Sequence, residues 1–407
     1  MKSFTTILLL AALAALVLLA PAPANAAKKM EVTVQDDSVF LYNSPYYDRE
    51  VAFRQLRKLG ASRLRLNVLW FLTMPEEQAL ARTKPARIDY DWGIWDTAIA
   101  RAKQYGIDVQ LDLTGDPPTW ACGKNLPPNE CDGFKPKTKQ FKAFTRAAAR
   151  HFGKRVKRYS IWNEPNWHSW VRPHKKSPRI YRRIYQAGYK GVKRGNRRAK
   201  VLMGETAPYF RPKLAISPLQ FIREMVCVNK RFKRIKGAKR KCPGKALKLD
   251  GYAHHPYDFT VRPDKRRKRR DDVTMANLGA LNKTLNKLRK KRLIKPSKKK
   301  IPVYLTEHGY YVKRPETPRG RGLSDRKRAK WTVQAFNIAQ RNARVKGMLY
   351  YVFVSPPPGH VSGFFDLGLI ATDGTERRPF TALQNWSQAA IADGRVKRPG
   401  RCTVPNC

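Results

Sequence analysis

The sequence predicts a single-domain α/β protein with the (β/α)8 (TIM) barrel fold. Short apolar segments with strand character alternate with segments of helical periodicity along most of the chain. Polar and aromatic residues also gather directly after these strands, and the loops that follow the strands of a barrel all open on one face. Counting one strand per unit gives seven or eight βα units without an internal linker. A doubly wound open sheet is the alternative, weakened because no Gly-x-Gly-x-x-Gly opens any of the helices.

The first half of the chain supplies these units in order. Residues 32–34 and 39–41 are expected to form an opening strand or hairpin. The next segment, 47–59, repeats apolar residues at helical spacing and ends at Gly60, a good helix C-cap. The remaining elements expected here are strands at 63–70, 109–113 and 159–162 and helices at 92–105 and 138–152.

The second half repeats the same alternation. We expect strands at 201–203, 251–255, 301–306 and 348–354, and helices at 180–192, 218–228, 275–288, 325–343 and 379–391.

Residues 1–26 resemble a secretory signal peptide rather than part of the fold. Lys2 provides the positive start, residues 7–20 the short apolar run, and residues 24–26 (Ala-Asn-Ala) a small-residue cleavage site. No later segment is apolar for long enough to span a bilayer, so we expect no transmembrane anchor after cleavage. The prediction is a secreted, extracellular protein with its barrel over residues 27–400 and a disulfide-clamped tail over 401–407.

All six cysteines lie after this leader, which favours disulfides in an exported protein. The sequence alone allows 15 pairings, and the three close pairs favour local staples. A metal site is the alternative, disfavoured because there is no Cys-x-x-Cys or clustered Cys/His spacing. The expected disulfides are Cys122–Cys131, Cys227–Cys242 and Cys402–Cys407.

The formal net charge of +54 is extreme for 407 residues. Such a field attracts polyanions, and the candidates are nucleic acid, an anionic cell envelope or an acidic polysaccharide. The alternative is that these charges form only a solvated surface. Specific nucleic-acid binding is disfavoured by export and by the absence of a helix-turn-helix, zinc-finger or RNA-binding signature.

Glu164 stands at the end of an apolar strand in the segment 159–166, Tyr-Ser-Ile-Trp-Asn-Glu-Pro-Asn. Pro165 cannot donate a backbone hydrogen bond, so the strand should stop there and become a loop. The carboxyl group then lies on the rim of the barrel among an amide and several indoles. A surface glutamate after a core strand is the alternative interpretation.

A second strand, in the segment 301–309, runs directly into Glu307, and Gly309 leaves room beside this carboxylate. Two carboxylates on one barrel rim are the equipment for glycoside hydrolysis, in which one protonates the leaving oxygen and the other attacks or activates water. In a retaining enzyme the two carboxyl groups lie about 5–5.5 Å apart, and in an inverting enzyme roughly 9 Å. Metal chelation would need further ligands at close spacing, so we expect no metal and no cofactor.

These two segments resemble the signatures of the clan A retaining glycoside hydrolases, which are (β/α)8 enzymes. Residues 162–166 resemble their acid/base motif and 305–309 their nucleophile motif, at a separation that suits strands four and seven. Residues 65–70 resemble the arginine-bearing strand of cellulase-like (family 5) members, and 255–257 their strand-six His-x-Tyr. The Trp residues that follow Asn166 resemble the family 39 pattern. The resemblance spans most of the chain, from about residue 39 to about residue 390.

The resemblance implies a secreted enzyme that cleaves O-glycosidic bonds of a poly- or oligosaccharide by double displacement. Glu164 would act as general acid and then base, and Glu307 as the nucleophile that forms a glycosyl ester. Asn163 would bind the sugar 2-hydroxyl, and Tyr257 and Arg65 would keep Glu307 ionised and oriented.

His255 would belong to the same substrate-binding set, whereas ordinary packing or a buried ion pair is the alternative for each supporting residue. His254 is the weaker candidate of the histidine pair, because a strand histidine is often only a satisfied core residue. A barrel that binds an anionic cell-surface polysaccharide without catalysis is the alternative function.

Aromatic side chains after the strands are candidate sugar-stacking platforms, with a loop core as their alternative role. They are Trp120, Trp167 and Trp170. The last strand, 349–354, departs from the clan pattern because it has no Trp at its end; Tyr351 or Phe353 could substitute.

Three basic runs differ in their expected position on the barrel. Residues 265–270 follow a strand and precede its helix, which places this run on the rim with the glutamates. The runs 230–241 and 290–300 connect helices to strands and should lie on the opposite face. Only the first is positioned to contact uronate, sulfate or phosphate groups of an acidic glycan. Electrostatic association of the basic protein with an anionic cell envelope is a further expectation.

Overall fold

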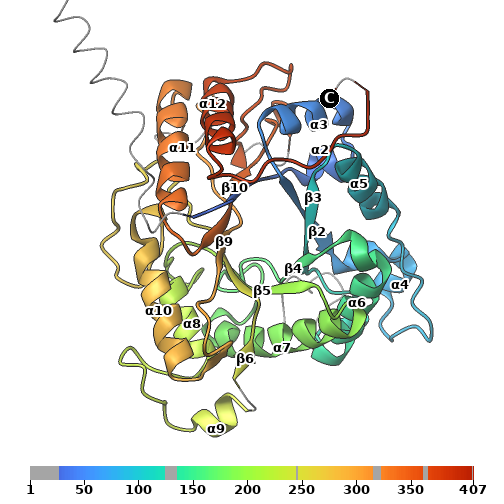
Figure 1. Cartoon of the computed structure of the whole chain (residues 1–407). Coiled ribbons are helices and arrows are strands. Elements are labelled where there is room, and N and C mark those ends of the chain that lie inside the picture. The colour runs from blue at the N-terminus through green and yellow to red at the C-terminus, as the bar shows by residue number, and fades with distance from the viewer. Residues whose placement is uncertain (1–26, 124–134, 244–245, 315–321, 361–364, 406) are drawn as a thin grey trace, which may run out of the picture.

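Eight parallel strands close into a barrel, as the sequence predicts, in the order β1-β10-β9-β7-β5-β4-β3-β2 (Figure 1). The structure is a computed structural model that describes residues 27–123, 135–243, 246–314, 322–360, 365–405 and 407. The predicted signal peptide, residues 1–26, lies outside the described residues. The barrel strands are β1 (Glu31–Gln35), β2 (Arg63–Leu69), β3 (Asp108–Thr114), β4 (Arg158–Ile161), β5 (Lys200–Thr206), β7 (Gly251–His254), β9 (Val303–Leu305) and β10 (Val345–Tyr351).

Each barrel strand is followed, before the next one, by a helix of the outer shell (Figure 1). The segment 138–152 shows why these segments are helical, because Phe141, Phe144, Ala148 and Phe152 recur at helical spacing and are all buried. The covering helices are α3 (Arg49–Lys58), α5 (Gly93–Gln104), α6 (Thr138–Phe152), α7 (Ser177–Gly195), α8 (Pro218–Met225), α10 (Leu278–Lys290), α11 (Asp325–Gln340) and α12 (Arg378–Ala392).

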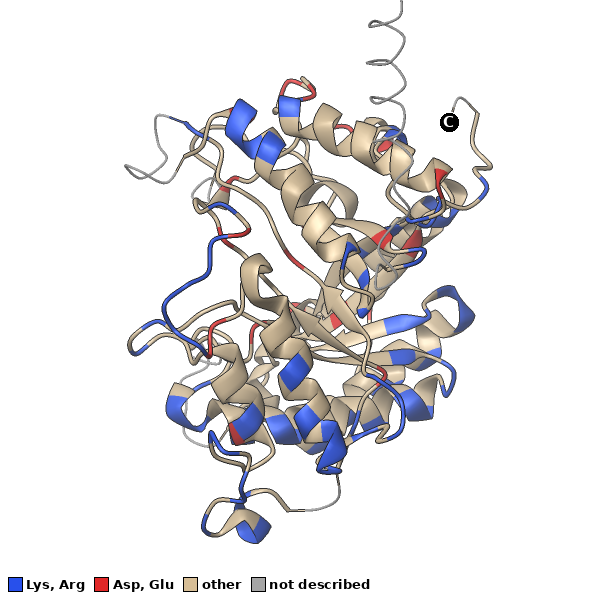
Figure 2. Ribbon diagram, turned by 60° about the vertical axis from the view of Figure 1, so that its left-hand side comes forward, with Lys and Arg blue, Asp and Glu red and all other residues tan. Residues whose placement is uncertain are grey.

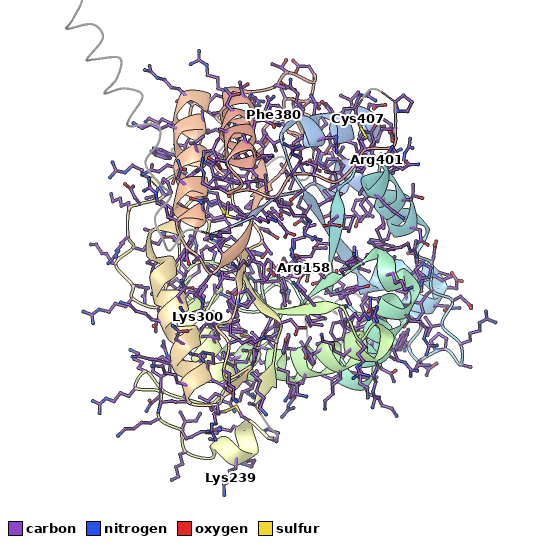
Figure 3. The ribbon with its side chains drawn as sticks, viewed as in Figure 1. Arg158, Lys239, Lys300, Phe380, Arg401 and Cys407 are labelled. Atoms are coloured by element: carbon purple, nitrogen blue, oxygen red, sulfur yellow. A yellow bond between two sulfur atoms is a disulfide. The ribbon has the colours of Figure 1, made fainter. Side chains whose placement is uncertain are left out.

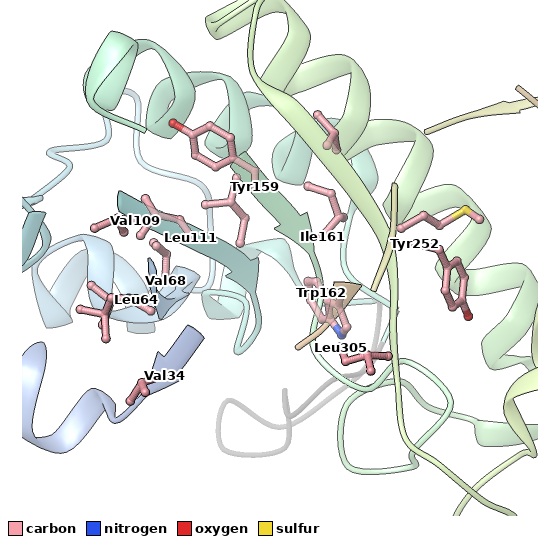
Figure 4. Close-up of a cluster of buried hydrophobic side chains, with 14 of the residues drawn as sticks. Val34, Leu64, Val68, Val109, Leu111, Tyr159, Ile161, Trp162, Tyr252 and Leu305 are labelled. Atoms are coloured by element: carbon pink, nitrogen blue, oxygen red, sulfur yellow. The ribbon is translucent and has the colours of Figure 1, made fainter. Parts of the chain in front are cut away.

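The main hydrophobic core lies between the strands and this helical shell. Leu64, Leu111, Ile161 and Leu305 belong to it and are almost completely inaccessible to solvent (Figure 4). Successive strand residues point to opposite faces of the sheet, so the residue after Leu64, Arg65, projects into the barrel. The barrel interior thus holds polar side chains at the end where the strands finish.

The predicted strand at 39–41 is wrong, because these residues belong to a short helix and its C-cap. Helix α2 (Asp37–Phe40) starts where the Asp36 carboxylate accepts from the backbone N–H of Val39 at 3.3 Å, a side-chain N-cap. Small elements outside the regular alternation were not predicted. These are α4 (Glu76–Leu80), α9 (Ala238–Lys241) and the two-stranded pair β6 (Leu247–Lys248) and β8 (Ile294–Lys295).

The N-terminal end of the barrel is closed by buried charges. Glu31 accepts from Arg63 Nη2 at 2.8 Å and from Arg158 Nη1 at 2.5 Å. The Arg158 guanidinium also lies over the ring of Tyr304, 4.3 Å from its centroid, and Figure 3 shows Arg158 near the middle of the barrel. Burial acts to raise the pKa of Glu31, but the two guanidinium groups outweigh it and lower this pKa to about 2.

Two predicted disulfides are present, Cys227–Cys242 and Cys402–Cys407. Cys122 is also disulfide-bonded, and its predicted partner, Cys131, lies outside the described residues. The first bridge closes the basic segment between α8 and β7, which carries Lys239 at the periphery of the molecule (Figure 3). None of the helices in the described ranges is long and apolar enough to cross a membrane.

The chain order assigns the basic runs to the faces that the sequence predicts. Residues 265–270 lie between β7 and α10, on the face where the strands end. Residues 230–241 and 290–300 lie between a helix and the next barrel strand, on the opposite face. Lys and Arg are also spread over the outer helices, and Asp and Glu are few (Figure 2).

Candidate active site

Glu164 lies on a sharply turned loop at the end of β4. Trp162 and Glu164 have positive φ angles of 68° and 29°, which L-residues rarely adopt. Two hydrogen bonds to β3 hold this turn in place: the backbone N–H of Trp162 donates to the Leu113 carbonyl at 3.0 Å, and that of Asn163 to Thr114 Oγ1 at 2.9 Å. The Glu164 side chain, 20% exposed, is thereby fixed on the barrel rim with one face open to solvent.

Glu307 lies two residues beyond β9, and its carboxylate has a partner on each oxygen. Arg65 Nη1 donates to Oε1 at 2.9 Å, and the Tyr257 hydroxyl donates to Oε2 at 3.0 Å. A Cβ at Gly309 would lie 2.3 Å from the Tyr351 carbonyl, so only glycine allows the chain to turn this closely behind the carboxylate. Burial raises the pKa of Glu307 above its usual value, although His255 and Arg65 act in the opposite direction.

His255 connects three carboxylates from three strands. Its Nδ1 lies 3.0 Å from Glu164 Oε1 and 3.4 Å from Glu307 Oε2, and its Nε2 lies 2.8 Å from Glu205 Oε2. Burial acts to lower the pKa of His255, but the carboxylates, with Glu307 the strongest, raise it to about 10. The ring is therefore protonated at neutral pH and donates from both nitrogens.

The floor of the site is a buried network around Arg65. Its Nη2 lies 3.2 Å from Asp112 and 3.5 Å from Glu205, and also donates to Asn163 Oδ1 at 3.1 Å. Burial would raise the pKa of Glu205, but Arg65 and His255 outweigh it and lower the pKa to about 2. Burial prevails at Asp112 and raises its pKa to about 7. The network fixes Arg65 beneath both Asn163 and Glu307.

The two rim glutamates are close enough to act on one bond. Within the group Glu164, His255 and Glu307, one candidate ligand atom from each residue lies within 4.8 Å of the others. An oxygen of Glu164 is thus within 4.8 Å of an oxygen of Glu307, an approach that suits the closely spaced carboxyl pair of a retaining enzyme. The same group has the composition of a metal site, and a metal bound there would have to displace the proton from His255.

Six of the residues predicted for the site are brought together: Glu164, Glu307, Asn163, Arg65, His255 and Tyr257. His254 is a satisfied core histidine, with Nδ1 2.9 Å from Thr206 Oγ1 and Nε2 3.0 Å from the Val273 carbonyl. Burial lowers the pKa of His254 to about 3, so it is neutral.

The three candidate platforms differ in environment. Trp120 is 3% exposed and donates from its indole nitrogen to the Gln78 carbonyl at 2.9 Å, which favours the loop-core alternative over a sugar platform. Trp167 and Trp170 are half-buried in the loop after Glu164.

At the end of β10, Phe353 is fully buried in the core, whereas Tyr351 is half-buried. Of the two proposed substitutes for a strand-eight Trp, Tyr351 is the one near Glu307: burial raises the pKa of the Tyr351 phenol, and the charge of Glu307 adds to this effect.

Sequence reasoning gave no role to Glu205, which occupies a central place in the site. It is fully buried, adopts φ 47°, and accepts from Thr306 Oγ1 as well as from His255. An acidic residue at the end of an apolar strand was the available signal, the same one that identified Glu164 and Glu307.

The fold matches solved structures of glycosidases. A family 39 glycoside hydrolase from the gut symbiont Bacteroides cellulosilyticus matches with a TM-score of 0.60 and 18% identity over 88% of this chain and 64% of that chain. A family 1 β-glucosidase from Thermotoga maritima matches with a TM-score of 0.56 and 13% identity over 91% of this chain and 99% of that chain. The chain has the fold of the clan A glycoside hydrolases.

An exo-β-1,4-mannosidase from an Opitutaceae bacterium also matches, with a TM-score of 0.52 and 14% identity over 92% of this chain and 63% of that chain. The chain thus spans just under two thirds of the length of this structure and of the family 39 structure. No protein-family model and no curated protein matches the sequence. The predicted resemblance to clan A is confirmed at the level of the fold.

Proposed function

We propose that this protein is an exported retaining glycoside hydrolase that cleaves O-glycosidic bonds of a poly- or oligosaccharide. The observation that carries the proposal is the pair of rim carboxylates, Glu164 and Glu307, with oxygens within 4.8 Å of one another. The environments of the two groups differ, which suits a division of roles. Glu307 is held by two donors, Arg65 and Tyr257, and Glu164 is the more exposed.

In the first step, the Glu307 carboxylate attacks the anomeric carbon. The glycosidic C–O bond breaks, and Glu164 transfers its proton to the departing oxygen. The bonds from Arg65 and Tyr257 orient the Glu307 carboxylate, and the charges of His255 and Arg65 favour its ionised form against the effect of burial. The result is a glycosyl ester on Glu307 and a free alcohol.

In the second step, Glu164, now a carboxylate, takes a proton from water. The water oxygen attacks the anomeric carbon, and the ester bond to Glu307 breaks, so two inversions give net retention. Protonated His255 lies 3.0 Å from Glu164 and 3.4 Å from Glu307, and it moderates the repulsion when both groups are charged. Asn163, oriented by Arg65, is the proposed partner of the sugar 2-hydroxyl.

A panel of aryl glycosides tests the proposal. We expect hydrolysis of at least one substrate with retained anomeric configuration, observed by NMR of the first product. The variant Glu307→Ala should lose this activity, and azide should restore it while forming a glycosyl azide of inverted configuration. Initial inversion of the product by the wild-type protein would refute double displacement. Binding of a glycan without any turnover would favour the non-catalytic alternative.

A further inference from the structure

Three arginines stack on aromatic rings beside the candidate active site. The Arg267 guanidinium carbon lies 4.1 Å from the ring centroid of Tyr209, and that of Arg269 lies 4.2 Å from the centroid of Phe210. Arg211 also lies over Tyr209, at 5.1 Å, and donates to its hydroxyl at 3.2 Å. Stacking uses the face of a guanidinium and leaves N–H groups at its edge for an anion. Arg211, Arg267 and Arg269 are called the arginine cluster below.

The cluster is joined to the loop that carries Glu164. Asn166, two residues after the glutamate, donates from its side-chain amide to the carbonyls of Ala207 at 3.1 Å and Ile216 at 2.8 Å. Its side-chain oxygen accepts from the Ala207 backbone N–H at 2.8 Å. These hydrogen bonds hold both ends of the segment 207–216, which carries Tyr209, Phe210 and Arg211.

Aromatic contacts join the cluster to Glu307 as well. Tyr257, which donates to Glu307, stacks on Phe259 with ring centroids 4.5 Å apart. Phe259 in turn meets the edge of Tyr209 at 6.5 Å between centroids. The platform beneath Arg267 is therefore two rings away from the hydrogen-bond partner of the proposed nucleophile.

The two cluster-bearing segments are held together by a buried carboxylate. Asp272 accepts from the backbone N–H of Phe210 at 2.9 Å and from Ser217 Oγ at 2.6 Å. The Val273 N–H donates to the Pro208 carbonyl at 2.8 Å. Arg267 and Arg269 thus extend from a segment pinned to the β5 loop.

The nearby acidic groups are already committed to other partners. Asp264 pairs with Arg262 at 2.5 Å, and Asp271 with Arg223 at 2.6 Å. Asp258 is buried, and burial raises its pKa well above the usual value, although a hydrogen bond from Thr274 and the charge of Arg267 act in the opposite direction. Within the described part of the chain, no carboxylate lies within ion-pair distance of the arginine cluster. Its exposed charges are available to a ligand.

We propose that the arginine cluster is a subsite for an anionic glycan, one whose sugars carry carboxylate or sulfate groups next to the bond held between Glu164 and Glu307. The inference rests on the proposed function, because it assigns the substrate class of the same site. Guanidinium groups form paired, charge-assisted hydrogen bonds with carboxylate and sulfate oxygens, which a neutral sugar does not offer. The rings beneath them hold the guanidinium groups in place before the ligand binds.

The experiment compares two variants of equal net charge. The triple variant Arg211→Gln/Arg267→Gln/Arg269→Gln removes the cluster, and Lys298→Gln/Lys299→Gln/Lys300→Gln removes three exposed charges from the opposite face of the barrel. Calorimetry measures the binding of uronate oligosaccharides, their carboxyl-reduced neutral forms, and a sulfated neutral oligosaccharide. Hydrolysis of each is followed in parallel, and thermal unfolding confirms that both variants fold. If the Gln triple does not fold, an Arg→Lys triple at the same positions replaces it.

We expect the cluster variant to bind an anionic oligosaccharide about tenfold to a hundredfold more weakly, and the control variant to bind like the wild type. The neutral oligosaccharides should bind the two variants with the same affinity. Comparison of the uronate and sulfated oligosaccharides shows which anionic group the cluster recognises. If both variants lost affinity for the anionic oligosaccharide equally, the effect would come from the net charge of the protein, and the inference would be overturned. Tight binding of the neutral oligosaccharides alone would also overturn it. Cluster-dependent binding without hydrolysis would support the subsite and refute the hydrolase proposal. Hydrolysis of neutral glycans that is unchanged in the cluster variant would support the hydrolase proposal and refute the subsite.

Discussion

At the scale of single residues, Glu205 is the buried charge on which the site depends. It contacts no position that a substrate is expected to reach, yet it accepts from His255 Nε2 at 2.8 Å and lies 3.5 Å from Arg65 Nη2. Its charge is one of those that raise the pKa of His255 and keep this ring a donor to Glu164. Glu205 is therefore a positioning residue that acts through His255 and Arg65.

Glu205→Gln should shift the pH dependence of activity. Removing a negative charge from Nε2 lowers the pKa of His255 from about 10 toward its ordinary value, so His255 loses its proton at lower pH. The alkaline limb of kcat/KM on an aryl glycoside should move to lower pH, with kcat/KM about 10- to 100-fold lower at the optimum. An NMR titration of His255 checks the pKa independently of activity. An unchanged alkaline limb together with an unchanged His255 titration would contradict the assignment.

Tyr257→Phe should weaken the chemical step without unfolding the protein. A hydrogen bond to a charged acceptor contributes about 1.5–3 kcal/mol, so loss of the bond to Glu307 should lower kcat/KM about 10- to 150-fold. Tyr185→Phe is the matched control, because Tyr185 lies on the outer helix α7 and its hydroxyl donates to the Lys248 carbonyl of β6, away from the site. The control should change the free energy of unfolding but leave kcat/KM near wild type. Equal activity of the two variants would remove Tyr257 from the proposed mechanism.

At the scale of elements, a glycine seam sets the distance between α6 and α7. A Cβ at Gly191 would lie 2.0 Å from Thr145 Oγ1 and 2.5 Å from the Lys142 carbonyl, and one at Gly195 would lie 2.4 Å from the Arg146 carbonyl. The backbone of α7 therefore touches α6 directly along this seam. These helices cover the strand that leads to Glu164, so the seam supports the position of the candidate catalytic loop.

Gly191→Ala should destabilise the protein by about 1–3 kcal/mol, because the added methyl group must push two helices apart. Gly279→Ala in α10 is the control, since a Cβ there meets nothing within 4 Å. This second change should be neutral or stabilise the fold by about 0.5–1 kcal/mol, as alanine favours the helix. Urea unfolding of both variants measures the difference. Similar midpoints would mean that the seam tolerates a larger separation.

The alternation of strands and helices was predictable because each pattern is local. Helix α6 was predicted at its observed bounds, since its apolar residues recur along one face. The error at 39–41 has an equally local cause: Val39, Phe40 and Leu41 have the composition of a strand, but the side chain of Asp36 caps a helical turn over them. The N-cap hydrogen bond of Asp36 thus favours a helical turn over the strand that the apolar composition indicates.

The candidate site was predictable only in part. Glu164 and Glu307 stand out because a proline or glycine follows a strand that ends in an acid. The partners of Glu205 depend on how β5, β7 and β9 are aligned in the closed barrel, which no local pattern encodes. The burial of Trp120 has the same origin, since its partner, the Gln78 carbonyl, belongs to a separate loop.

At the scale of the whole molecule, the cluster of Glu31, Arg63 and Arg158 closes the end of the barrel opposite the site. The folded pKa of Glu31 is about 2, against an ordinary value of 4.5. Its ion pairs therefore contribute fully to stability above about pH 4.5, and this contribution is lost as the pH falls toward 2.

Glu31→Gln should lower the free energy of unfolding at pH 7 by about 3–5 kcal/mol, because two buried guanidinium groups lose their counter-charge. The deficit relative to wild type should shrink as the pH is lowered from 4.5 toward 2, since the wild-type carboxylate is then protonated as well. Denaturant unfolding at neutral and acid pH measures this change. The pH profile of activity should stay unchanged, in contrast to Glu205→Gln. A deficit that is constant with pH would contradict the assigned ion pairs.

The Cys227–Cys242 bridge also bears on how the molecule survives attack by proteases. The segment that it encloses carries eight Lys and Arg residues between Lys230 and Lys241, most of them exposed. It is therefore a target for any enzyme that cuts after basic residues. A cut inside the segment leaves both new ends tied to the body by the same covalent link, 15 residues apart in sequence. The nicked chain keeps α8 and β7 joined, and its two pieces come apart only when a reductant and a denaturant act together.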